Sequence, residues 1–268
     1  MFKPTSRLGY QPKYTSPKDG YWYKEDFKGG EALAEVLVST FLRSCTNLTE
    51  LDFVPYILNY TSDGLIDLKT CVSPNFLQEG EQFVSFKELL SLVPRPADNL
   101  VGFDSKLDYI DSVFQQTVSQ SFREEMLRLL TLDVMFRNTD RHLSNFGIIL
   151  TSDGSIRFAP IFDNGLALGV SEGAYFDLDN LIKGLGYKIK PYDLSVSTLS
   201  PQIITSYFQF DVLAFVEFVD KNTPKINILL GFLNLLVLYY PTDCNGRDTK
   251  EVLESVFGKF SRKRFLND

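Results

Sequence analysis

The sequence predicts an α+β fold of two lobes, with a small strand-rich lobe over residues 1–73 and a larger helical lobe over residues 74–268. Three observations favour this division. Strand, helix and strand patterns follow one another up to the break at Pro74 and Asn75, and helical periodicity dominates beyond it. A short hairpin between polar turns interrupts the helical part. A chain of 268 residues is long enough to form both lobes.

The N-terminal lobe is predicted to contain strands on either side of one helix. Aromatic residues around Trp22 indicate strands and a hairpin that ends at Lys24. Residues 31–43 have the apolar spacing of a three-turn helix, which places Glu31 and Glu35 on one face. Residues 51–60 and 64–72 are typical of two further strands, joined by a turn at Gly64.

The clearest helical pattern of the C-terminal lobe predicts a helix over residues 119–137. A polar break follows, and then apolar runs at 146–150 and 155–159, which a turn at Gly154 joins into a hairpin. A second polar turn closes the hairpin at residues 160–165. The remainder, about 200–265, is expected to form three helices, and its apolar stretch at 226–240 is too short for a membrane span of roughly 20 residues.

Composition excludes several classes of function. The net charge of −7 disfavours direct binding of nucleic acid, because an acidic chain repels phosphate backbones. The three cysteines, Cys45, Cys71 and Cys244, have no spacing typical of a zinc site or a disulfide framework, so we expect a reducing cytoplasm. The first residues lack an apolar signal region, and no membrane span is expected.

The residues that carry chemistry lie in the polar turns at the two ends of the hairpin. Asp140 and Asn145 precede the hairpin and Asp163 follows it. The hairpin can therefore bring all three side chains together at its open end, which we call the hairpin mouth. Phosphoryl transfer requires such a set: one carboxylate positions the attacking hydroxyl, while a carboxylate and an amide oxygen hold Mg²⁺ against a triphosphate. Protein kinases also place the catalytic Asp five positions before the metal-binding Asn, as Asp140 stands before Asn145.

Simpler interpretations exist for the same residues. Asp and Asn are common turn formers, and any one of the three alone would more often be a turn residue than a ligand. His142 is the single histidine of the chain. It could act as a base or a zinc ligand, but we favour a role in bracing the loop around Asp140 or Asp163, because zinc partners are absent from the sequence.

These motifs together resemble those of the HipA-like kinases. The pattern Asn138-x-Asp140-x-His142-x-x-Asn145-x-Gly147, followed by Ala159-Pro160-x-Phe162-Asp163, is similar to that family's catalytic loop and metal-binding turn. The pattern Ser6-x-x-Gly9-x-Gln11-x-Lys13 is similar to its phosphate-covering loop. The resemblance implies a two-lobed protein-kinase-like fold that uses ATP and Mg²⁺. It also implies that Lys24 contacts the phosphates and pairs with a helix glutamate, with Glu35 as first choice and Glu31 as second.

The resemblance carries expectations about regulation and partners. Full-length members of the family have an additional N-terminal region that contacts an antitoxin, and the phosphate loop here begins near residue 5. The sequence thus resembles a short form of the family that lacks this region, which argues against a toxin role unless the region lies on another chain. An antitoxin-like partner would be a separate chain. The resemblance further implies that Ser6 is a site of autophosphorylation, which would eject the loop.

The sequence thus predicts a Ser/Thr kinase of the HipA-like type that acts on an unknown protein substrate. Asp140 would be the base, Asn145 and Asp163 the metal ligands, and Lys24 and Glu35 the phosphate clamp. A lipid or small-molecule kinase on the same fold, and a non-catalytic nucleotide-binding docking protein, are the alternatives.

Overall fold

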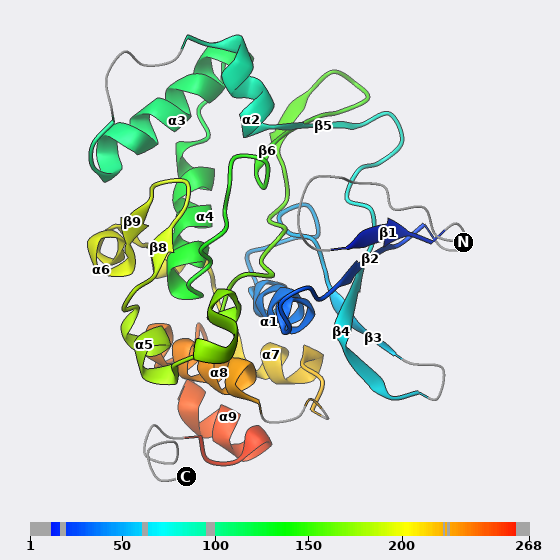
Figure 1. Cartoon of the computed structure of the whole chain (residues 1–268), viewed down its shortest axis with the longest axis vertical. Coiled ribbons are helices and arrows are strands. Elements are labelled where there is room, and N and C mark those ends of the chain that lie inside the picture. Colours follow the sequence, from blue (N-terminus) through cyan, green and yellow to red (C-terminus); the bar gives the residue numbers. More distant parts are fainter. Residues whose placement is uncertain are drawn as a thin grey trace.

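The computed structural model describes residues 12–16, 20–60, 64–94, 100–221, 223 and 226–260. A four-stranded antiparallel sheet forms one side of the molecule, in the order β1-β2-β4-β3 (Figure 1). Its strands are β1 (Lys13–Thr15), β2 (Trp22–Glu25), β3 (Ile57–Tyr60) and β4 (Ile66–Ser73). Helix α1 (Glu31–Arg43) lies between this sheet and helices α7 (Val212–Phe218) and α8 (Asn227–Tyr239) of the other lobe.

Helix α1 is fixed at its start by the loop that connects it to β2. The Asp26 carboxylate accepts hydrogen bonds from the backbone N–H groups of Gly30 and Ala32. Gly30 has a φ of 97°, a left-handed conformation that glycine adopts without a steric penalty. Because α1 is covered on both sides, almost all of its side chains are buried, Glu35 included.

The helical lobe begins with a second, three-stranded sheet that carries the predicted hairpin. Its order is β5-β6-β7, with β5 (Gln82–Ser85), β6 (Gly147–Leu150) and β7 (Ile156–Phe158). The backbone of β5 passes so close to Gly147 that a Cβ there would lie 2.2 Å from the carbonyl oxygen of Val84. Helices α2 (Phe86–Leu89), α3 (Phe103–Val118) and α4 (Arg123–Met135) complete this half of the lobe.

The rest of the helical lobe consists of short elements followed by three longer helices. The short elements are α5 (Leu178–Lys183), β8 (Lys188–Ile189), β9 (Leu194–Ser195) and α6 (Val196–Leu199), with 3-10 turns at Leu90–Leu92, Val170–Tyr175, Ser200–Gln202 and Thr205–Tyr207. The longer helices are α7 (Val212–Phe218), α8 (Asn227–Tyr239) and α9 (Thr249–Phe257). In the part of the chain that is described, no helix combines the length and apolarity needed to cross a membrane.

Two predicted elements are shorter than expected. The helix expected over 119–137 begins only at Arg123, because Ser119 turns left-handed with a φ of 55° and Asp111 of α3 binds the backbone N–H of Phe122. The strand expected over 51–60 is limited to β3, because Phe53 is buried against Ile161 and forms an isolated bridge with it.

The α+β fold with a small sheet lobe and a larger helical lobe is confirmed, and one hydrophobic core joins the two parts. Phe41 of α1 is fully buried, and its ring lies 5.0 Å from Phe136, 5.5 Å from Phe208 and 5.3 Å from Phe210. A division of the chain at residue 73 coincides with the end of β4, but α1 packs into the same core as the helices after it. The boundary itself stays a prediction.

Candidate active site

An ion cluster, buried at Lys24 and Glu35 and half-buried at Asp163, joins the sheet, helix α1 and the turn after β7. The Lys24 ammonium lies 2.6 Å from Glu35 Oε1 and 2.8 Å from Asp163 Oδ1. Lys24 is on β2 and Glu35 on α1, and the side chain of Glu35 is fully buried. A buried charge is stable only when it is paired and hydrogen-bonded, so these three side chains depend on one another.

The charges of this cluster favour the ionised forms of Lys24 and Asp163. Burial lowers the pKa of Lys24, but the negative charges of Asp163 and Glu35 outweigh it and hold that pKa well above its usual value. Burial raises the pKa of Asp163, but the charges of Lys24 and Lys13 outweigh it and hold that pKa well below its usual range. At neutral pH the site therefore contains a charged lysine beside a charged carboxylate.

The turn at Asp163 is held in an unusual backbone conformation. Asp163 has a φ of 61°, which non-glycine residues adopt only where the surrounding structure stabilises it. The next residue, Asn164, donates its backbone N–H to Glu35 Oε2 at 2.8 Å. The Glu35 carboxylate thus binds Lys24 with one oxygen and the turn with the other.

The structure separates the two glutamates that the sequence left as alternatives. Glu31 accepts hydrogen bonds from the backbone N–H groups of Phe27, Lys28 and Gly29, and so stabilises the loop before α1. Glu35 lies one turn further along and reaches Lys24. This geometry favours Glu35 as the partner of the lysine.

Asp140 and Asn145 lie in the loop between α4 and β6. The Asn145 amide nitrogen donates to the backbone carbonyl of Asp140 at 3.2 Å, so the amide oxygen is left for another partner. The Asp140 carboxylate is more open than Asp163, with a third of its side chain exposed, and Lys190 Nζ lies 3.0 Å from it. Of the two carboxylates, Asp140 is thus the one that an acceptor can reach from solvent.

Arg141 ties this loop to the Asp163 turn. Its fully buried guanidinium binds Asp133 of α4, Asn164 Oδ1 at 2.7 Å, and the backbone carbonyl groups of Asn145 and Phe162. One side chain therefore contacts residues on both ends of the hairpin. The backbone at Asn145 and the backbone next to Asp163 are thereby held close together.

Sequence reasoning missed Arg141 and its partner Asp133. An arginine between two polar loop residues has the pattern of a solvated position, and nothing local reveals its burial. Asp133 carries the signal that could have been used, because it is a carboxylate on the apolar stretch 129–134 of a helix and must have a buried partner.

His142 is half-buried and contacts its own loop. Its backbone N–H donates to the carbonyl of Asp140 at 2.6 Å, and its imidazole Nδ1 accepts from the backbone N–H of Ser144 at 3.3 Å. Both bonds shape the turn that presents Asp140. A bracing role within the loop is consistent with this geometry and stays a prediction.

The phosphate loop is only partly described. Ser6, Gly9 and Gln11 lie outside the described residues. Lys13, on β1, places its ammonium 3.4 Å from Asp163 Oδ1, so a second lysine reaches the same carboxylate. The two lysines concentrate positive charge where the polyphosphate of a nucleotide would lie.

The donor set at the hairpin mouth fits Mg²⁺. Asp163 and Asn145 offer one carboxylate and one amide oxygen, and the hydrogen bonds that Asp163 accepts from Lys13 and Lys24 both end on Oδ1. Within the described ranges, no three His, Cys, Asp or Glu side chains gather into a cluster that could hold a metal by themselves. A magnesium ion there would complete its shell with water and phosphate oxygens, which is its usual behaviour in phosphoryl-transfer enzymes.

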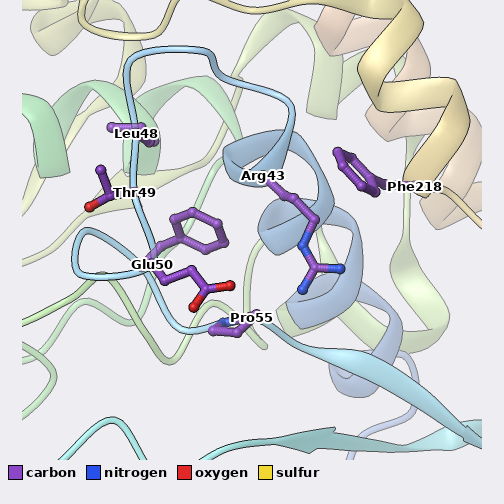
Figure 2. Close-up of a pocket in the computed structure, with 7 residues that line it drawn as sticks. Arg43, Leu48, Thr49, Glu50, Pro55 and Phe218 are labelled. Carbon is purple, nitrogen blue, oxygen red and sulfur yellow. The ribbon is translucent and has the colours of Figure 1, made fainter.

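Two cavities of the described structure lie away from this cluster. The larger, about 480 Å³, is at the C-terminal end of α1, where Figure 2 shows Arg43 between Glu50 and Phe218. Arg43 is eight residues beyond Glu35, or about 12 Å along the helix axis. The smaller, about 250 Å³, lies between Gly29, Val170 and Ile228. Neither includes the residues predicted to bind the nucleotide.

The comparisons with known proteins agree with the class of protein that the fold and motifs indicate. Residues 80–180 match the family model of the HipA-like C-terminal domain, a range that includes Asp140, Asn145 and Asp163. The resemblance to the HipA-like kinases is thereby confirmed. No curated protein matches the sequence significantly.

A solved structure extends the likeness to the whole chain. The fold is similar to that of the proinflammatory kinase CtkA of Helicobacter pylori, with a TM-score of 0.56 and 16% identity. The similarity covers 95% of this chain and 96% of that one. The family match and this fold support a kinase, and the fold includes the N-terminal lobe that contains Lys24 and Glu35.

Proposed function

We propose that the chain is an ATP- and Mg²⁺-dependent kinase of the HipA-like type that phosphorylates Ser or Thr hydroxyls of a protein. The observation that supports this most is the cluster of Lys24, Glu35 and Asp163, linked through Arg141 to the loop of Asp140 and Asn145. Its parts correspond to the functions that phosphoryl transfer needs, namely a phosphate clamp, metal ligands and a group that positions the acceptor.

Each side chain has a defined task in this proposal. Lys24 and Lys13 bind phosphate oxygens, and Glu35 holds Lys24 in place. Asn145 and Asp163 would hold Mg²⁺, which when bound neutralises negative charge on the phosphates. The two lysines also balance the charge of Asp163, so that the carboxylate stays ionised and able to bind a cation.

The proposed transfer step involves only ATP, the acceptor hydroxyl and the side chains of the site. The acceptor hydroxyl oxygen forms a bond to the γ-phosphorus, and the bond from that phosphorus to the bridging oxygen of ADP breaks. The hydroxyl proton goes to the Asp140 carboxylate, and ADP leaves with the negative charge of the bridging oxygen. Asp140 is suited to this task because it is the more exposed of the two carboxylates.

The experiment is phosphate transfer from γ-labelled ATP by the wild type and Asp140→Ala, with protein, inositol lipid and aminoglycoside acceptors in parallel. We expect the wild type to label protein Ser or Thr and Asp140→Ala to lose the label. Label on a lipid or a small molecule would identify the other kinase class. If the wild type and Asp140→Ala both bind nucleotide but transfer phosphate only at the background rate, the chain is a non-catalytic docking protein.

Two further parts of the proposal concern regulation. Autophosphorylation of Ser6 would place a phosphate on the loop that precedes β1, and mass spectrometry after incubation with ATP tests it directly. Unmodified residues 1–20 in an active preparation would contradict it. The antitoxin-like partner on a separate chain and the cytoplasmic location also stay predictions.

A further inference from the structure

Lys190 makes a long-range contact with the residue proposed to receive the acceptor proton. Its Nζ lies 3.0 Å from Asp140 Oδ1, although the two residues are 50 positions apart in the chain. About half of the Lys190 side chain is exposed. The ammonium therefore lies at the solvent-accessible side of Asp140, the side from which an acceptor hydroxyl would approach.

The backbone on both sides of Lys190 is anchored. Ile189 and Tyr192 are buried, with exposures of 0% and 1%. The Tyr192 ring packs on Phe103 of α3 at 5.2 Å between centroids, and the backbone N–H of Asp193 closes the β8–β9 turn on the carbonyl of Ile189 at 2.8 Å. Lys190 thus extends from a fixed turn rather than from a free loop.

The positive charge here complements that on the other side of the site. Lys24 and Lys13 surround Asp163, where the nucleotide phosphates would lie, and Lys190 is at Asp140. An ion pair as exposed as that of Lys190 adds little to folding stability. We therefore expect the ion pair to affect the charge and the orientation of Asp140 rather than the stability of the fold.

We propose that Lys190 is a positioning residue for phosphoryl transfer, and this rests on the function proposed above. Its ammonium holds the Asp140 carboxylate in the orientation that meets the acceptor hydroxyl. It also supplies positive charge on the acceptor side of the transferred phosphoryl group, where fixed charges lower the barrier most effectively.

The test compares Lys190→Ala, Lys190→Gln and Lys190→Arg with Lys188→Ala, which removes an exposed lysine from the same hairpin. Initial rates of transfer from labelled ATP to the acceptor that the wild type labels give kcat and KM for ATP. We expect Ala and Gln at position 190 to lower kcat about 100-fold, as the loss of a preorganised donor does. The KM for ATP should stay unchanged, Arg should restore most of kcat, and Lys188→Ala should match the wild type.

The outcomes separate this inference from the proposed function. A wild type that transfers phosphate, with Lys190→Ala and Lys190→Gln equally active, overturns the inference alone. The inference is also overturned if Lys188→Ala lowers kcat as much as Lys190→Ala, or if Lys190→Arg does not restore kcat. Either result would show that kcat depends on the structure of the hairpin and not on the charge of Lys190. A wild type that binds ATP and Mg²⁺ but transfers phosphate to no acceptor overturns the proposed function, and the inference with it.

Discussion

At the scale of single residues, the proposed function assigns different tasks to the two carboxylates beside the hairpin. Asp163 lies beside two lysines with 17% of its side chain exposed, whereas Asp140 is 33% exposed and faces Lys190. The less accessible carboxylate, whose charge two lysines compensate, suits a cation, and the more accessible one suits a proton from an acceptor. This division of tasks predicts that substitution of Asp163 impairs nucleotide binding, whereas substitution of Asp140 impairs phosphate transfer.

We expect Asp163→Ala to abolish Mg²⁺-dependent nucleotide binding, because it removes the carboxylate ligand. Asp140→Ala should bind nucleotide as the wild type does and lose transfer by about 100-fold or more, the usual contribution of a positioned base. Calorimetric titration with an ATP analogue and a transfer assay measure the two effects. Asp153→Ala, in the exposed turn at the far end of the same hairpin, is the matched control and should change neither. Loss of binding by both site variants would contradict the division of tasks.

Glu35 and Glu31 allow a similarly sharp comparison on one helix. Glu35→Gln removes the negative charge that binds both Lys24 and the Asn164 N–H. We expect this change to raise the KM for ATP about tenfold. A tenfold change corresponds to the lower end of the roughly 1.5–3 kcal/mol that a hydrogen bond to a charged group contributes. Glu31→Gln should lower the free energy of unfolding by about 1 kcal/mol through the loop before α1, with an unchanged KM. Steady-state kinetics and urea denaturation distinguish them. A raised KM for Glu31→Gln alone would reverse the assignment.

At the scale of elements, the buried pair of Arg141 and Asp133 connects α4, the polar loop and the turn after β7. Arg141→Met leaves Asp133 as an uncompensated buried charge, which we expect to cost about 3–5 kcal/mol in the free energy of unfolding. The double variant Arg141→Met, Asp133→Leu should recover most of that stability, because an apolar pair can replace a buried ion pair. It should not recover transfer, because the bonds to Asn164, Phe162 and Asn145 are still missing.

Chemical denaturation and the transfer assay test this pair together. Recovery of both stability and activity in the double variant would show that Arg141 has a packing role only. Recovery of neither would show that the pair is coupled to more of the core than the residues it contacts.

The elements also show what the sequence could reveal and what it could not. The spacing of Asp140 and Asn145 and the hairpin between Asn145 and Asp163 are local patterns, and the structure contains the hairpin where the sequence placed it. The start of α4 was predicted four residues too early, because Asp111 of the preceding helix determines it. The burial of Arg141 arises from three separate segments, and a local pattern contains no trace of such a contact.

At the scale of the whole molecule, the two lobes share one hydrophobic core around Phe41. We therefore expect the molecule to unfold in one transition. Trp22, the single tryptophan, lies on β2 and reports on the sheet lobe by fluorescence, while far-UV circular dichroism is dominated by the helical lobe. The two urea transitions should coincide in midpoint and slope.

Phe41→Leu is the variant that probes this coupling. It removes ring contacts that join α1, which packs on β4 of the sheet, to the helical lobe, so both signals should move together to a lower urea concentration. Separate transitions for Trp22 fluorescence and circular dichroism would show that the lobes are independent, and would favour a true domain boundary at residue 73.

The central claim is that the nucleotide binds where Lys24, Asn145 and Asp163 meet. A crystal structure with a non-hydrolysable ATP analogue and Mg²⁺ tests it most directly. We predict a magnesium ion bound by Asn145 and Asp163, with phosphate oxygens within hydrogen-bond distance of the Lys24 ammonium. A nucleotide bound elsewhere, for example in the cavity beside Arg43, with the ion pair of Lys24 and Asp163 intact and no metal beside it, would contradict the account.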